Sequence, residues 1–178
     1  MGAETALVII DVQAGLFDDD DAQDHAVLAR ITVLLARARA SEAPVIYVQH
    51  DGGPGHPLAA NTTGWQIHPA IAPRADDLIV HKRASDAFYK TSLQRALDAR
   101  GVMRLVVAGA MTEYCVDTTC RRALSQGYDV TLVADGHATG DGDGMARAAK
   151  IAWHNAVLAD LAHPDHQITV LPASAVTL

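Results

Sequence analysis

The chain has 178 residues, of which 49% are hydrophobic, so it is long enough and apolar enough to form one domain with a sizeable core. Its formal net charge of −7 and the lack of a Lys/Arg block argue against a nucleic-acid partner. It has no apolar run of the roughly 18 residues that a membrane span needs, and residues 1–10 do not resemble a signal peptide. We therefore expect a single cytoplasmic domain over residues 1–178, with no membrane partner.

Short runs of apolar, β-branched residues alternate along the chain with longer segments rich in Ala and Leu. The short runs predict strands that are covered on both faces, because apolar residues follow one another in them almost without interruption. These runs are 6–10, 45–48, 78–80, 105–108, 130–134 and 168–171. Helical spacing of apolar residues predicts helices over 24–43, 89–99, 115–126 and 144–162. The alternation predicts an α/β fold in which a six-stranded, mostly parallel sheet lies between layers of helices.

One long segment, residues 50–73, shows no periodicity and is rich in Gly, Pro, Asn and Thr. A loop of this length in a compact domain is usually functional. We therefore expect this loop to help shape a binding site.

Two cysteines, Cys115 and Cys120, lie on the third predicted helix. Their spacing fits neither a disulfide framework nor a zinc site, so both are expected to be free thiols in a reducing compartment. Cys120 falls on the apolar stripe of the helix and is expected to be a core residue.

Three residues whose side chains could take part in catalysis follow three of the predicted strands. Asp11 and Lys82 come after the first and third strands, and Cys115 follows the fourth, where a helix starts after the N-cap candidate Thr112. Sites in open parallel sheets lie beyond the carboxyl ends of the strands. Backbone N–H groups at a helix start favour a thiolate and can bind an oxyanion, and a carboxylate can take the thiol proton. Taken singly, Cys115 also fits a small core residue, Asp11 a loop hydrogen bond, and Lys82 a solvated surface residue.

The order and spacing of these motifs resemble the isochorismatase-like cysteine hydrolases. The resemblance rests on residues 7–13 (LVIIDVQ), on Lys82 followed by residues 87–88 (AF), and on residues 109–116 (GAMTEYCV). It continues through residues 118–119 (TT), 127–130 (GYDV) and 133–135 (VAD), and so covers nearly the whole chain. This superfamily includes nicotinamidases, N-carbamoylsarcosine amidases, ureidoacrylate and maleamate amidohydrolases, and streptothricin hydrolases.

The resemblance implies a three-layer, Rossmann-like fold with strand order 3-2-1-4-5-6. It also implies that Asp11, Lys82 and Cys115 form a catalytic triad. In this family the backbone N–H groups at Met111 and Cys115 would form an oxyanion hole, next to a cis peptide bond between Ala110 and Met111.

The resemblance separates this chain from nicotinamidases, which bind a metal through an Asp-x-His pair after the second strand. That pair is absent here, and residues 64–69 (GWQIHP) resemble a segment of the metal-free hydrolases. We therefore expect no metal and no cofactor. A metal set drawn from the acidic and histidine residues of this region stays open as an alternative; its members are His50, Asp51, His56 and His68.

The expected activity is cleavage of a C–N bond in a small molecule, namely an amide, ureide or lactam, through a thioester on Cys115. Candidate pocket residues are Gln13, Phe17, Trp65 and Tyr114. One alternative is an isochorismatase-type vinyl ether hydrolase, for whose anionic substrates the nearby cations are Arg74, Arg83 and Lys90. Another alternative is a binding protein that kept the fold without catalysis. The superfamily also implies a homodimer or homotetramer, with Trp153 as an interface anchor, and Asp135 is expected to be structural.

Overall fold

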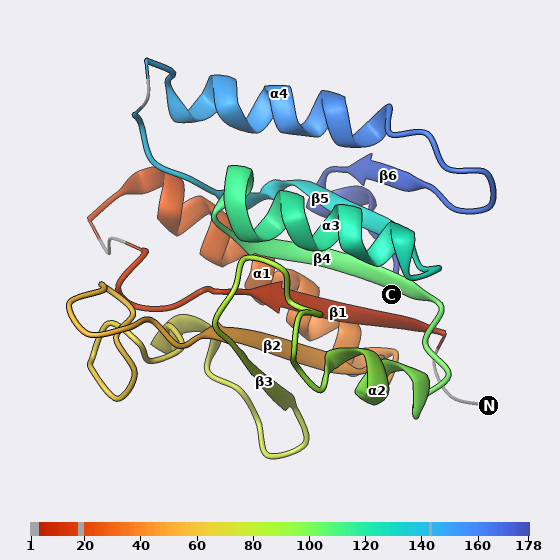
Figure 1. Ribbon diagram of the computed structural model, residues 1–178, viewed down its shortest axis with the longest axis horizontal. Coiled ribbons are helices and arrows are strands. Elements are labelled where there is room, and N and C mark those ends of the chain that lie inside the picture. The colour runs from red at the N-terminus through yellow and green to blue at the C-terminus, as the bar shows by residue number, and fades with distance from the viewer. Residues whose placement is uncertain (1–3, 18–19, 143) are drawn as a thin grey trace.

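The computed structural model describes residues 4–17, 20–142 and 144–178. Its strands form one sheet in the order β3-β2-β1-β4-β5-β6, and each adjacent pair is parallel (Figure 1). The strands are β1 (Thr5–Ile10), β2 (Val45–His50), β3 (Leu78–Lys82), β4 (Arg104–Ala110), β5 (Asp129–Ala138) and β6 (Ile168–Leu171). The predicted strand order is confirmed, and the sheet is parallel throughout rather than mostly parallel.

The four predicted helices are present, but each is shorter than the sequence pattern suggested. They are α1 (Ala22–Ala40), α2 (Leu93–Asp98), α3 (Asp117–Ser125) and α4 (Arg147–Ala159). Three short helical turns accompany them, η1 (Pro69–Ile71), the π-helical turn η2 (Thr112–Val116) and η3 (Ala173–Ala175). No helix in the described part of the chain is long and apolar enough to cross a membrane.

The start of α2 shows why the apolar spacing overestimated the helix over residues 89–99. Lys90 has a positive φ of 54°, which an α-helix does not allow. The Thr91 hydroxyl donates to the Ala87 carbonyl and accepts from the Leu93 N–H, so it holds a turn there instead. The helix therefore begins only at Leu93.

Helices cover both faces of the sheet and create two apolar layers. The helix α1 begins after Asp21, whose carboxylate accepts from the N–H groups of Gln23 and Asp24, and it packs on the face that carries Leu7, Ile9 and Tyr47. The helices α2, α3 and α4 cover the other face (Figure 1). The resulting α-β-α sandwich is the expected architecture.

The carboxyl ends of β1 and β4 lie in direct contact at the centre of the sheet. Ile10 pairs with Gly109, which has a φ of 130°. A Cβ atom at this glycine would clash with the backbone of Ile10. This close approach brings the residues that follow the two strands together at the topological switch point.

Candidate active site

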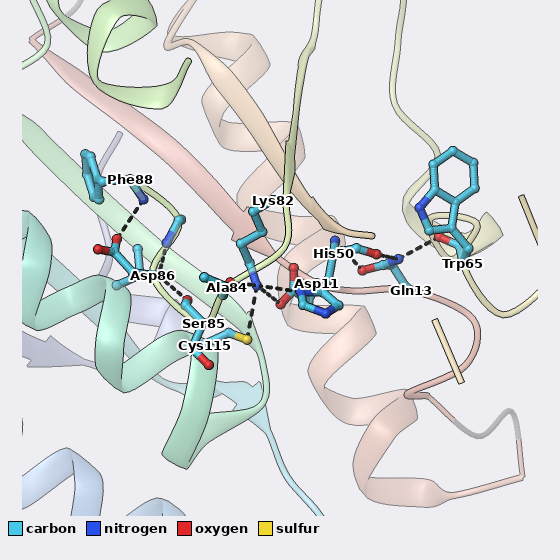
Figure 2. A network of polar contacts seen from close by, with 12 residues as sticks. Asp11, Gln13, His50, Trp65, Lys82, Ala84, Ser85, Asp86, Phe88 and Cys115 are labelled. Atoms are coloured by element: carbon cyan, nitrogen blue, oxygen red, sulfur yellow. Dashed lines mark hydrogen bonds and ion pairs between the residues drawn. The ribbon is translucent and has the colours of Figure 1, made fainter. Parts of the chain in front are cut away.

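Three side chains from separate parts of the chain meet at this end of the sheet. Asp11 directly follows β1 with a φ of 48°, Lys82 is the last residue of β3, and Cys115 lies in the turn η2 after β4. The Lys82 ammonium lies between the other two, with Nζ 2.7 Å from Asp11 Oδ2 and 3.1 Å from Cys115 Sγ (Figure 2). The structure thus brings together the three residues that the sequence singled out.

Lys82 is buried, and polar groups surround its ammonium. Besides Asp11 and Cys115, Nζ contacts the Ala84 carbonyl at 3.0 Å and His50 Nδ1 at 3.4 Å. A buried cation needs such partners because burial removes its hydration shell. The Lys82 side chain is therefore part of a fixed polar network rather than a solvated surface group.

Burial makes the carboxyl and the thiol weaker acids than usual. Burial raises the pKa of Asp11, and the nearby Lys82 and Cys115 partly offset this effect. Burial, followed by the charge of Asp11, raises the pKa of Cys115 to about 11, against the lowering effect of Lys82. The raised pKa of Cys115 favours the neutral thiol, whereas the helix-start argument from the sequence favoured a thiolate.

The turn that carries Cys115 is anchored differently from the sequence expectation. Thr112 does not act as an N-cap, because its hydroxyl donates to the Ala138 carbonyl and contacts His137 Nδ1 at 2.8 Å. Nε2 of His137 contacts the side-chain oxygen of Asn155 at 2.9 Å, which ties the turn to α4. Just before the turn, the peptide bond between Ala110 and Met111 is cis, at the place where the resemblance implies one.

A cavity of about 310 Å³ opens beside Asp11 and Cys115. Residues of several elements and loops line it: Asp11, Leu16, His50, His56, Leu58, Ser85, Met111, Tyr114 and Cys115. Tyr114 is half exposed, and its neighbour Cys115 is partly accessible. A small molecule in this cavity would lie against both the carboxylate and the thiol.

Of the four pocket residues expected from the sequence, only Tyr114 lines this cavity. Gln13 is fully buried, and its side-chain amide pairs with the backbone of His50 and Trp65. Phe17 packs in the core against His68. These aromatic and amide side chains thus support the loops instead of forming the wall.

Trp65 is the third residue that lies outside the lining of the cavity. Its ring stacks on His81, and its Nε1–H donates to Asp51 at 2.7 Å. The sequence identified the loop over residues 50–73 as a pocket element but did not show which of its residues form the wall. The cavity-lining residues within this range are His50, His56 and Leu58. The polar or apolar character of a loop residue did not show whether it lines the cavity or packs behind the lining.

The histidines and the carboxylate after β2 do not form a metal set. Asp51 is bound to Trp65 and His81, and His68 packs on Phe17. Across residues 4–17, 20–142 and 144–178, no group of three or more His, Cys, Asp or Glu side chains is placed to hold a metal ion. The donor set is therefore unsuitable for the alternative metal site that the sequence left open.

Two further residues have the structural roles expected of them. Cys120 is fully buried in the core between α3 and the sheet. Asp135 accepts from Arg30 Nε at 2.6 Å and from the Ala173 N–H at 2.8 Å, which ties β5 to α1 and η3. Neither residue lines the cavity beside Cys115.

Comparisons with known proteins agree with this fold. Residues 5–162 match the isochorismatase domain. A streptothricin hydrolase of Streptomyces noursei is 42% identical over 138 residues, which cover 76% of this chain and 50% of the relative. The ureidoacrylate amidohydrolase RutB of Methylobacterium radiotolerans is 29% identical, over 83% of this chain and 72% of the relative.

A solved structure shows the same architecture over almost the full chain. The crystal structure of an isochorismatase from Pseudomonas putida KT2440 superposes with a TM-score of 0.86 at 31% identity, covering 97% of this chain and 90% of that one. The chain spans about half the length of the streptothricin hydrolases that it matches. Since the domain match covers most of the chain and the fold agrees, the protein belongs to the isochorismatase family.

Proposed function

We propose that the protein is a cysteine hydrolase that cleaves the C–N bond of a small amide, ureide or lactam. The observation that carries this proposal is the buried Asp11–Lys82–Cys115 arrangement beside a cavity of suitable size. The names of two relatives, a streptothricin hydrolase and a ureidoacrylate amidohydrolase, support the same class of reaction.

In the first half of the reaction, Asp11 accepts the thiol proton while Sγ of Cys115 attacks the scissile carbonyl carbon. The raised pKa of the thiol means that proton transfer accompanies C–S bond formation instead of preceding it. The backbone N–H groups of Met111 and Cys115, both cavity-lining residues, bind the developing oxyanion. When the C–N bond breaks, Asp11 returns the proton to the leaving nitrogen and a thioester remains on Cys115.

In the second half, water hydrolyses the thioester. Asp11, again a carboxylate, accepts a proton from the water as its oxygen attacks the thioester carbon. Oδ1 of Asp11 is buried and has no hydrogen-bond partner among the described residues, so it is available for this proton. Collapse of the tetrahedral intermediate breaks the C–S bond, and the proton passes from Asp11 back to sulfur. Lys82 keeps Asp11 in position through both halves.

The charge of the cavity favours this reaction over vinyl ether hydrolysis. An isochorismatase-type substrate is anionic and needs cations in the pocket. The lining residues contain no Arg or Lys, and the adjacent Lys82 ammonium is already paired with the Asp11 carboxylate. Arg83 and Lys90, two of the three cations that the sequence suggested for such a substrate, line a different cavity together with Lys82.

The proposal is tested by incubating the purified protein with a panel of small amides, ureides and lactams. Ammonia release reports the primary amides, and mass spectrometry reports ring opening or amine release. We expect at least one substrate to be hydrolysed by the wild type and by Cys120→Ala, but not by Cys115→Ala. Equal turnover by Cys115→Ala and Cys120→Ala would refute the cysteine mechanism, because both variants lose one thiol but only Cys115 lines the cavity.

A further inference from the structure

Two imidazole side chains, His50 and His56, line the cavity, although the proposed hydrolysis uses neither of them. Their ring centroids are 5.4 Å apart, and they come from the end of β2 and from the loop that follows. A pair of histidines beside a reactive thiol can act as acids, bases, metal ligands or hydrogen-bond donors. The contacts of each ring decide among these roles.

The neighbours of His50 determine which of its nitrogens carries the proton. Nδ1 lies 3.4 Å from Lys82 Nζ (Figure 2). An ammonium group can only donate, so Nδ1 must be the acceptor and the proton of the neutral ring is on Nε2. Burial and the charge of Lys82 lower the pKa of His50 to about 4, so the ring stays neutral at physiological pH. His50 therefore presents one N–H donor, at Nε2.

His56 is fixed in the same tautomer by its own loop. Its Nδ1 accepts a hydrogen bond from the Leu58 N–H at 3.0 Å, which leaves Nε2 to carry the proton of the neutral ring. The loop is closed by the Gly52 N–H, which donates to the Leu58 carbonyl at 2.8 Å. A Cβ atom at Gly52 would lie 2.5 Å from Nδ1 of His56, so the ring packs directly on the glycine. The position of His56 is thus built into the loop.

Neither Nε2 atom donates to another protein group within the described residues. Two N–H donors beside the cavity suit an acceptor oxygen of the substrate. The lining offers no Arg or Lys to pair with an anion, and the Lys82 ammonium behind it is already engaged with the Asp11 carboxylate. These features together favour an uncharged oxygen, such as a second carbonyl.

We propose that His50 and His56 determine substrate specificity by donating hydrogen bonds from Nε2 to a second carbonyl oxygen, separate from the scissile one. The substrate class is accordingly an uncharged amide, ureide or lactam that carries a further carbonyl group. This inference rests on the proposed function, because it takes the cavity beside Cys115 as the substrate site.

The test uses the Cys115→Ser variant and two amides of similar shape. Acetoacetamide carries a second carbonyl, and 3-methylbutanamide has a methyl-bearing carbon in its place. Imidazole ¹⁵N NMR is expected to show the Nε2–H tautomer for both histidines at neutral pH. Acetoacetamide should shift both Nε2 resonances and bind more tightly than 3-methylbutanamide, by roughly threefold to tenfold for each hydrogen bond.

Matched variants separate a donor role from general packing. In the Cys115→Ser background, His56→Phe and His50→Leu should reduce the preference for acetoacetamide. His56→Gln, which keeps an N–H donor, should retain part of it. The exposed His25→Gln is the control and should change nothing. Equal affinity for the two amides, or an Nδ1–H tautomer in either ring, would overturn the inference. Because binding is measured without turnover, a lack of hydrolysis by the wild type would count against the proposed function alone.

Discussion

Nζ of Lys82 lies 2.7 Å from Oδ2 of Asp11, and both side chains are almost completely buried. Asp11 directly follows β1 and Lys82 ends β3, and these two strands do not touch because β2 lies between them. Two strand spacings are about 10 Å, so a long side chain is needed to reach across β2. Lysine at the end of β3 meets that need, and it contacts the Cys115 sulfur as well.

Lys82→Met is expected to abolish hydrolysis and to lower the free energy of unfolding by roughly 3–5 kcal/mol, because it leaves the Asp11 carboxylate buried without its cation. Urea unfolding monitored by circular dichroism measures the stability. The double variant Asp11→Asn/Lys82→Met should regain part of that stability and no activity. A single variant as stable as the wild type would show that the pair is not coupled.

Alkylation by iodoacetamide should report the raised pKa of Cys115. The thiol pKa of about 11 predicts slow labelling at pH 7 and a rate that rises about tenfold per pH unit across the neutral range. Peptide mass spectrometry measures the rate, with the buried Cys120 as an internal control that stays unlabelled in the folded protein. Fast labelling of Cys115 with a plateau below pH 8 would instead indicate a thiolate in the resting enzyme.

The pH dependence of kcat/KM should show an acidic limb set by Asp11. The reaction requires the carboxylate, so activity is lost as the pH falls through the Asp11 pKa, which burial raises above its usual value of 3.8. Protonation of His50 occurs near pH 4 and could give a similar limb. The pH profile of His50→Leu distinguishes the two groups. If Asp11 sets the acidic limb, the limb should persist in this variant; if the limb disappears, His50 is responsible for it.

Gly109→Ala is expected to destabilise the fold by at least about 2 kcal/mol, since a side chain there combines a strained φ with a clash against Ile10. Thermal unfolding measures the effect. Gly53→Ala is the control, because a Cβ atom at that position meets open space. If the two variants unfolded at the same temperature, the close contact of β1 with β4 would not constrain this position.

The sheet and the three central residues could be predicted because each leaves a local trace in the sequence. Buried parallel strands appear in the sequence as apolar runs, and the three residues lie at or shortly after strand ends: Asp11 follows β1, Lys82 ends β3 and Cys115 lies in the turn after β4. The predicted strands were too short where polar residues continue the hydrogen-bonded pairing between strands, as at the end of β5 (Asp129–Ala138). Hydrogen bonding along the backbone does not require an apolar side chain, so composition could not reveal those ends.

The cavity wall could not be predicted because it depends on how the loop over residues 50–73 folds. Trp65 is a residue type that often lines pockets. Here it hydrogen-bonds to Asp51 and stacks on His81, and it does not line the cavity. His56 reaches the wall because of its hydrogen bond with Leu58. Similarly, the π-helical turn at Thr112–Val116 depends on long-range contacts with β5, which helical periodicity does not record.

The proposed reaction requires Cys115 to form a thioester with the acyl part of the substrate. Rapid acid quench during turnover of a hydrolysed amide, followed by peptide mass spectrometry, tests it most directly. We expect the peptide containing Cys115 to gain the mass of the acyl group, and Cys115→Ala to show neither this adduct nor turnover. Sustained turnover by Cys115→Ala, or an acyl group found on another residue, would contradict it.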